Sequence, residues 1–329
     1  MKALVCHTYG PINSHRVRNL PDPVAGPGEV VVDVAYSTVN FPDTLIVQGL
    51  YQVKPPTPFV PGHECSGIIS QVGSGVTNCR VGDRVFVSTG INGFAEKFVI
   101  ASNRIRHIPE WVSLPVAATL GITYCTALHA LKDCGHVKAN EWVLVLGAAG
   151  GVGSAAIEIA KAMGARVIAA ASTQEKLEYC TSIGADAVIN YEVDDVRTRI
   201  KEITNNQGID VVVDNVGGPY SETAFRSLAY RGRHLVIGFT SGSIPAIPLN
   251  LALLGERSIT GVYVGAWSPK NPEQVNANNQ QLFQWVKEEK LKPLFTKTFP
   301  LDSTTEALQY AAERKAMGKI LIEVDSKLL

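Results

Sequence analysis

The chain has 329 residues, more than one hydrophobic core usually holds, so two domains are expected. Hydrophobic residues make up 46% of the chain and charged residues 18%, which excludes a disordered protein. Thirty basic residues balance thirty acidic ones and no basic block stands out, so nucleic acid is an unlikely partner on electrostatic grounds.

Cysteine spacing and apolar segments favour a cytoplasmic protein. The six cysteines are widely spaced and form no Cys-x-x-Cys pair, so free thiols are expected. Met1 leads directly into a strand-like segment without a signal-peptide pattern. Residues 111–131 carry no Asp, Glu, Lys or Arg and could span a bilayer by length. Because this stretch contains Pro115, Gly121, four hydroxyl residues and His129, a buried helix at a domain junction is favoured over a membrane span.

Residues 1 to about 110 are predicted to be rich in β-strands, since short β-branched runs alternate with Gly and Pro turns. These runs cover residues 29–39, 67–72, 83–88 and 96–100. From residue 141 to about 262, continuous apolar strands alternate with helical patterns instead. This alternation predicts a parallel sheet with helices on both faces.

Two amphipathic helices and a strand are predicted near the carboxyl end. The helices cover residues 272–289 and 303–317, and the strand covers residues 318–324. The second helix has Asp302 or Ser303 as its N-cap and Glu306 in its first turn.

A glycine-rich turn at residues 147–153 follows an apolar strand and opens a helix. Glycines let a pyrophosphate approach the backbone, and free N–H groups at the helix start favour its charge. Such glycine patterns also arise by chance, but this one begins a βαβ unit, which is the context that a dinucleotide site requires.

The segment after the second strand of that unit favours NADPH over NADH. An NAD site usually places an Asp or Glu there to bind the ribose 2′-hydroxyl. Here the chain has Ser172 and Thr173, with no acid before Glu175, and Lys176 follows. Hydroxyls and an ammonium can hold a 2′-phosphate that a carboxylate would repel. A lysine exposed to solvent on a helix is the alternative for Lys176 alone.

Nearly the whole chain resembles the zinc-free quinone oxidoreductase branch of the medium-chain dehydrogenase/reductase superfamily. The resemblance is carried by residues 39–51, 59–69, 72–85, 120–128, 147–153, 189–191 and 318–324. It implies an α/β protein with a GroES-like β-rich catalytic domain, residues 1–120 with 263–329, and a Rossmann domain with a doubly wound parallel sheet, residues 121–262. The active site is then expected in the cleft between them.

The residues present argue against zinc. Zinc members of the superfamily share the motif Gly62-His63-Glu64, but their catalytic metal also needs two cysteines. Asn40 stands at the position of the first cysteine and Thr119 near that of the second. The run of four cysteines that holds a structural zinc is missing as well. No bound metal is therefore expected.

The resemblance also implies roles for individual residues. Asn40 and Thr123 are expected at the nicotinamide end, and the backbone N–H groups of Gly150, Gly151 and Val152 at the pyrophosphate. Around the 2′-phosphate it implies Ser172, Lys176 and Tyr191, with Arg314 closing over it from the carboxyl-terminal helix. Phe239, Val262 and Tyr263 resemble the two loops that line the nicotinamide. For Asn40, Tyr191, Phe239 and Arg314, a purely structural role is the alternative.

Hydride transfer from a nicotinamide depends mainly on orientation, so no acid–base constellation is required, and none is found. The product oxyanion or enolate still needs a proton. Tyr51 is the candidate donor, with a packing tyrosine as the alternative, and Asp43 is expected to order the loop at Asn40. Asn40 and Tyr51 are thus the candidate catalytic residues.

The resulting prediction is an NADPH-dependent quinone reductase that acts on a small molecule. A 2-alkenal, enone or enoyl-thioester reductase shares every cofactor residue and is the first alternative. An NADPH-binding protein with little turnover is the second. Superfamily members commonly pair their Rossmann sheets edge to edge, and the apolar segment 244–254 would suit such a homodimer.

Overall fold

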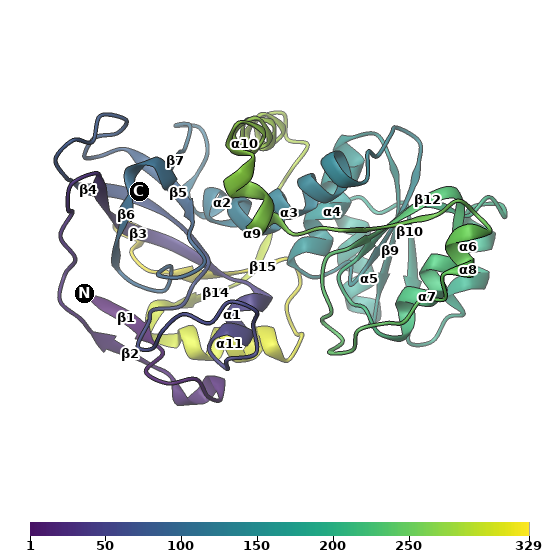
Figure 1. Ribbon diagram of the computed structural model, residues 1–329, viewed down its shortest axis with the longest axis horizontal. Coiled ribbons are helices and arrows are strands. Elements are labelled where there is room, and N and C mark those ends of the chain that lie inside the picture. The colour runs from purple at the N-terminus through teal and green to yellow at the C-terminus, as the bar shows by residue number, and fades with distance from the viewer. Residues whose placement is uncertain (329) are drawn as a thin grey trace. The chain divides into compact units, whose positions relative to one another are not determined.

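The structure, a computed structural model, describes residues 1–328, which form two compact units. One contains residues 1–122 and the chain from residue 293 onward, and the other contains residues 123–292. In Figure 1 the purple and yellow ends of the chain therefore belong to the same unit.

The first unit is built on a seven-stranded sheet with the order β14-β15-β3-β4-β5-β7, in which β6 also pairs with β3. Its strands are β3 (Glu29–Val39), β4 (Glu64–Val72), β5 (Arg84–Ser88), β6 (Lys97–Ala101), β7 (Arg106–His107), β14 (Phe295–Pro300) and β15 (Lys319–Glu323). Strands β1 (Lys2–Val5) and β2 (Arg16–Asn19) form a separate antiparallel pair. Val30, Val32 and Val34 alternate along β3 into one core, as a strand with one buried face requires.

Three helices accompany this sheet. They are α1 (Phe41–Ile46), α2 (Leu114–Thr119) and α11 (Thr304–Ala312). All four predicted strand segments are found, whereas the helix predicted over residues 303–317 ends early. Ser303 is at the N-cap position, but its side chain makes no capping hydrogen bond. Arg314 has a φ of 58°, a left-handed conformation that ends a helix, so it lies beyond α11 rather than on it.

The second unit contains a six-stranded parallel sheet with the order β10-β9-β8-β11-β12-β13. Its strands are β8 (Trp142–Leu146), β9 (Arg166–Ala171), β10 (Ala187–Asn190), β11 (Ile209–Asp214), β12 (Leu228–Val236) and β13 (Ser258–Gly261). Its helices are α3 (Cys125–Leu128), α4 (Gly151–Ala162), α5 (Gln174–Ser182), α6 (Val196–Ile203), α7 (Pro219–Arg226), α8 (Asn250–Leu253), α9 (Val264–Trp267) and α10 (Pro272–Lys287). The strand order reverses between β8 and β11, the position where such sheets bind ligands.

The second unit ends at residue 292, later than the boundary at 262 expected from the sequence. Helix α10 explains the difference, because its polar side chains hold it to α3 and to the segment that follows α3. Lys132 donates to Asn278 Oδ1 at 2.9 Å, and Asn278 donates to Asp133 Oδ2 at 2.9 Å. Asn279 Oδ1 accepts from the Cys125 thiol.

A continuous helical stretch, Leu114–Cys134, is long and apolar enough to cross a membrane by length and composition. In the structure 72% of its most apolar window is buried. It includes two π-helical turns, at Leu120–Tyr124 and His129–Cys134. The burial matches the core helix expected from its proline, glycine and hydroxyl residues.

Candidate functional site

The glycine-rich turn of the second unit has the geometry of a pyrophosphate site. Gly147 has a φ of 66°, and a Cβ on it would lie 2.8 Å from Val216 Cγ2. A Cβ on Gly153 would lie 2.3 Å from the Gly147 carbonyl oxygen, so only glycine lets α4 start this close to the turn. Gly150 is the N-cap, and Gly151 and Val152 open the helix with N–H groups that have no acceptor within it.

Asn215 is a site residue that the sequence analysis missed. It follows β11 and donates to the carbonyl oxygen of Leu146, the last residue of β8, at 3.0 Å. Its Oδ1 is buried and has no hydrogen-bond partner among the described residues. A buried orphan acceptor beside the strand-order reversal fits a ligand that donates a hydrogen bond there. The sequence did offer one signal for Asn215, namely a polar residue directly after β11, the fourth strand of the alternating strand–helix pattern.

Three of the predicted 2′-phosphate residues come together at the carboxyl ends of β9 and β10. Lys176 Nζ lies 3.5 Å from Ser172 Oγ. The backbone N–H of Tyr191 donates to the Ala171 carbonyl, which places Tyr191 beside the Ser172 turn. Thr173 caps α5 by accepting from the Lys176 N–H, which fixes the turn in position. The Tyr191 ring packs on Tyr220, with centroids 4.4 Å apart. Arg314, the fourth predicted residue, belongs to the other unit.

The other predicted residues of the second unit follow the carboxyl ends of β12 and β13, at the same edge of the sheet as the glycine turn. Phe239 is partly exposed and its ring covers Gly217, where a Cβ would lie 2.7 Å from Phe239 Cδ1. Val262 is buried and Tyr263 is exposed at the start of α9. Thr123, also buried, lies in the first π-helical turn, where this unit begins. A dinucleotide fits this edge, since the glycine turn, the unpaired Asn215 oxygen and the group of Ser172, Lys176 and Tyr191 lie at the ends of neighbouring strands.

In the first unit, Asn40 belongs to a buried polar cluster. Lys319, on β15, donates to Asn40 Oδ1 at 2.7 Å and to Glu64 Oε1 at 2.8 Å. Asn40 Nδ2 donates to the same Glu64 oxygen at 3.0 Å, and the Thr38 hydroxyl also donates to it. The other Glu64 oxygen accepts the Ile122 N–H at 2.6 Å. These bonds fix which way the Asn40 amide faces, because a flip would turn its NH₂ group toward an ammonium.

A second pair of buried groups adjoins this cluster through Asp43, on α1. Asp43 Oδ2 accepts the Asn40 backbone N–H at 2.8 Å, and Oδ1 lies 2.6 Å from His63 Nδ1. The Asp43 side chain is fully buried, and the Tyr51 and His63 rings lie nearly perpendicular, at 84° and 5.9 Å between centroids. Asp43 thus orders the loop at Asn40, as expected, and in addition binds His63.

The described residues contain no group of three or more His, Cys, Asp or Glu side chains that could hold a metal ion. At the position of the zinc motif, His63 is bound by Asp43, and Glu64 is paired with the Lys319 ammonium. A cation from the protein itself therefore compensates the Glu64 charge.

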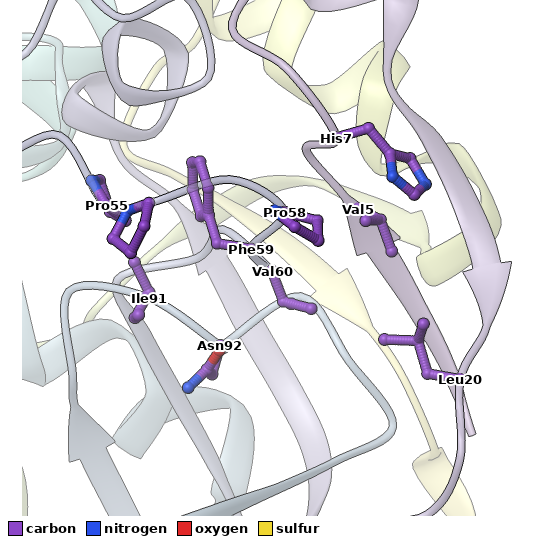
Figure 2. Close-up of a pocket in the computed structure, with 10 residues that line it drawn as sticks. Val5, His7, Leu20, Pro55, Pro58, Phe59, Val60, Ile91 and Asn92 are labelled. Carbon is purple, nitrogen blue, oxygen red and sulfur yellow. The ribbon is translucent and has the colours of Figure 1, made fainter.

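Figure 2 shows a separate apolar pocket of about 450 Å³ in the first unit, lined by residues such as Val5, Pro58 and Phe59. His7 is the one titratable side chain that lines it. Neither Asn40 nor His63 contributes to it, so the pocket is not part of the polar cluster.

Comparison with known proteins identifies the family. Residues 26–110 match the alcohol dehydrogenase GroES-like domain, and residues 151–282 match the zinc-binding dehydrogenase domain. With its β-rich unit and its Rossmann unit, the chain belongs to the medium-chain dehydrogenase/reductase superfamily, in the quinone oxidoreductase branch that its sequence resembles. It is an oxidoreductase of this superfamily.

Individual relatives cover nearly the whole chain. Quinone oxidoreductase-like protein 2 of Bos taurus is 36% identical over 92% of this chain and 87% of its own length. The structure of Escherichia coli quinone oxidoreductase complexed with NADPH has a TM-score of 0.92 and 28% identity, and covers 98% of this chain and 100% of the other. The CurK enoyl reductase structure has a TM-score of 0.87 and 27% identity, with 98% of both chains covered.

Proposed function

We propose that the protein is an NADPH-dependent reductase that transfers hydride to quinones without zinc. One observation carries the choice of cofactor: Lys176, Ser172 and Tyr191 gather where an NAD site would place a carboxylate. An ammonium and a hydroxyl favour a 2′-phosphate. The likeness to an NADPH-complexed quinone oxidoreductase supports the same cofactor.

Bound NADPH would supply the hydride, and the chain would orient it. The N–H groups of Gly151 and Val152 would bind the pyrophosphate, and Asn215 Oδ1 would accept a hydrogen bond from the cofactor. Phe239 and Tyr263 would border the nicotinamide. Asn40, whose amide is fixed by Lys319 and Glu64, would present its side chain in one orientation. Pre-organised contacts of this kind lower the cost of reaching the reactive geometry.

The experiment is NADPH consumption by the purified protein with 1,4-naphthoquinone and with trans-2-hexenal, measured side by side, with NADH as the control. Faster turnover of the quinone, and with NADPH over NADH, supports the proposal. Faster turnover of the enal favours the alternative of an enone or enoyl-thioester reductase. The similarity to the CurK enoyl reductase structure supports that alternative. Tight NADPH binding without turnover of either acceptor would favour a binding protein with little turnover.

We also propose a homodimer through the second unit. Strand β13 is at an edge of the parallel sheet, and the segment near it exposes four large apolar side chains. These are Ile244, Leu249, Leu253 and Leu254, each at least 76% exposed. A patch of this kind is typical of an interface between copies. Light scattering of the protein and of the variant Leu253→Glu/Leu254→Glu would test it, since a dimer of the native chain should become a monomer in the variant.

A further inference from the structure

The histidine of the Gly62-His63-Glu64 motif has no role in the function proposed above. Its Nδ1 lies 2.6 Å from Asp43 Oδ1, inside a unit where Asp43 is fully buried and the His63 side chain is 10% exposed. Its other ring nitrogen, Nε2, forms no hydrogen bond to any residue in the described part of the chain. One nitrogen is therefore anchored and the other is left for a ligand or water.

The charged groups around His63 favour its protonated form. Burial by itself lowers the pKa of an imidazole. The carboxylate of Asp43, through its charge and its hydrogen bond, and the charge of Glu64 on β4 outweigh that burial. Lys319 on β15 acts in the opposite direction and is the weakest of these influences. The net result is that the pKa of His63 is raised above its ordinary value of 6.5.

His63 is also coupled to the predicted nicotinamide end of the first unit. The two oxygens of Asp43 join the Asn40 backbone to the His63 ring, so one rigid carboxylate sets the spacing of both. The ring of Tyr51, the remaining titratable group facing His63, packs nearly perpendicular to it and restricts its rotation. A histidine held on two sides in this way keeps Nε2 in a fixed direction.

We propose that His63 is the catalytic acid of the reaction and that Asp43 is its positioning residue. This proposal rests on the reductase function proposed above. Hydride addition to a quinone carbonyl oxygen or ring carbon leaves an anion that must gain one proton. The Nε2–H bond of the imidazolium breaks as the new O–H bond forms, the hydride having brought both electrons. Water then returns a proton to the neutral imidazole, so that atoms and charge balance over one turnover.

An imidazolium suits this step better than the Tyr51 phenol. A phenol has an ordinary pKa of about 10, so at neutral pH it is the weaker acid by several powers of ten. General acid catalysis is most effective when the pKa of the acid lies near the working pH. In this assignment Tyr51 packs against the His63 ring, and its hydroxyl does not enter the proton transfer.

The test combines kinetics with a measurement that does not depend on turnover. The kcat/KM of the native protein for the quinone should fall as pH rises through the pKa of His63, because kcat/KM follows the free enzyme, whose acid form is then lost. NMR titration of the His63 ring protons, identified by their absence in His63→Gln, should give the same pKa. In His63→Gln this fall of the rate at high pH, the kinetic limb, should vanish, and kcat should be about 10²-fold lower or more. The Kd for NADPH should stay within about twofold of the native value.

The control variant is His107→Gln, which removes an exposed histidine 3.8 Å from Asp83 in the same unit. It should keep both the rate and the limb. A His63→Gln protein that binds NADPH normally and retains the limb and the rate would overturn the proposal, as would an NMR pKa that differs from the kinetic one. If the native protein reduces no quinone or enal, the reductase function itself fails, and the acid role fails with it.

Discussion

The buried pair of Lys319 and Glu64 offers the sharpest test of the site in the first unit. Both side chains are at most 3% exposed, and Lys319 Nζ donates to Glu64 and to Asn40. The variant Lys319→Met largely keeps the volume of the side chain, but Glu64 loses the cation that compensates its charge. Breaking a buried pair in this way costs about 3 to 5 kcal/mol. Three donors, from Thr38, Asn40 and Ile122, still bind Glu64, so we expect the lower end, about 3 kcal/mol.

Urea unfolding at pH 7 measures this loss, and a melting temperature lower by roughly 6 to 12 °C would accompany it in a unit of this size. The double variant Lys319→Met/Glu64→Gln should recover more than half of the loss, because no charge is then left unpaired. Lys54→Met, at an exposed loop lysine, is the control and should unfold like the native chain. A loss below about 1 kcal/mol in Lys319→Met, or a double variant less stable than the single one, would refute the reasoning.

Three further predictions concern the cofactor, the metal and the proton. Lys176→Ala should weaken NADPH binding about tenfold or more but leave NADH binding nearly unchanged, because it removes an ammonium aimed at the 2′-phosphate; equal losses measured by fluorescence titration would remove that role. Metal analysis of the purified protein should find no stoichiometric zinc, and a full equivalent per chain would contradict zinc independence. Tyr51→Phe keeps the ring against His63, so quinone and enone rates should stay within about twofold of native; a selective loss of enone reduction would instead make the Tyr51 hydroxyl the proton donor.

Local features of the site were predictable from the sequence because their causes are local. The turn at residues 147–153 follows a strand and opens a helix, and a Cβ on Gly153 would meet the Gly147 carbonyl oxygen inside the turn itself, at 2.3 Å. Ser172 and Lys176 could be assigned because they follow the second strand of the βαβ unit directly, whereas Tyr191 was added by the family resemblance. The apolar period predicts that the last helix continues through Arg314, because the period carries no sign of the left-handed residue that ends the helix.

The polar cluster of the first unit depended on contacts between distant parts of the chain. Glu64 and Lys319 are 255 residues apart, and no spacing rule joins them. The sequence showed that the zinc-ligand cysteines that accompany the Gly62-His63-Glu64 motif in zinc enzymes are missing. It did not show which groups would bind His63 and Glu64 instead. Asn215 was missed for a similar reason, since its unpaired oxygen becomes visible only when β8 and β11 lie side by side.

The 255 residues between Glu64 and Lys319 also affect how the protein folds during its synthesis. At about 5 to 20 residues per second, a ribosome adds Lys319 roughly 13 to 50 s after Glu64. Residues 123–292 form a continuous unit that can fold during this interval, whereas β3 must wait for β15 to pair along its edge. Until then Glu64 has no cation beside it, and the nascent first unit keeps an open strand edge. Strand β15, which is synthesised long after β3, therefore completes the core around the candidate site, and until then the growing chain depends on protection of that edge from other chains.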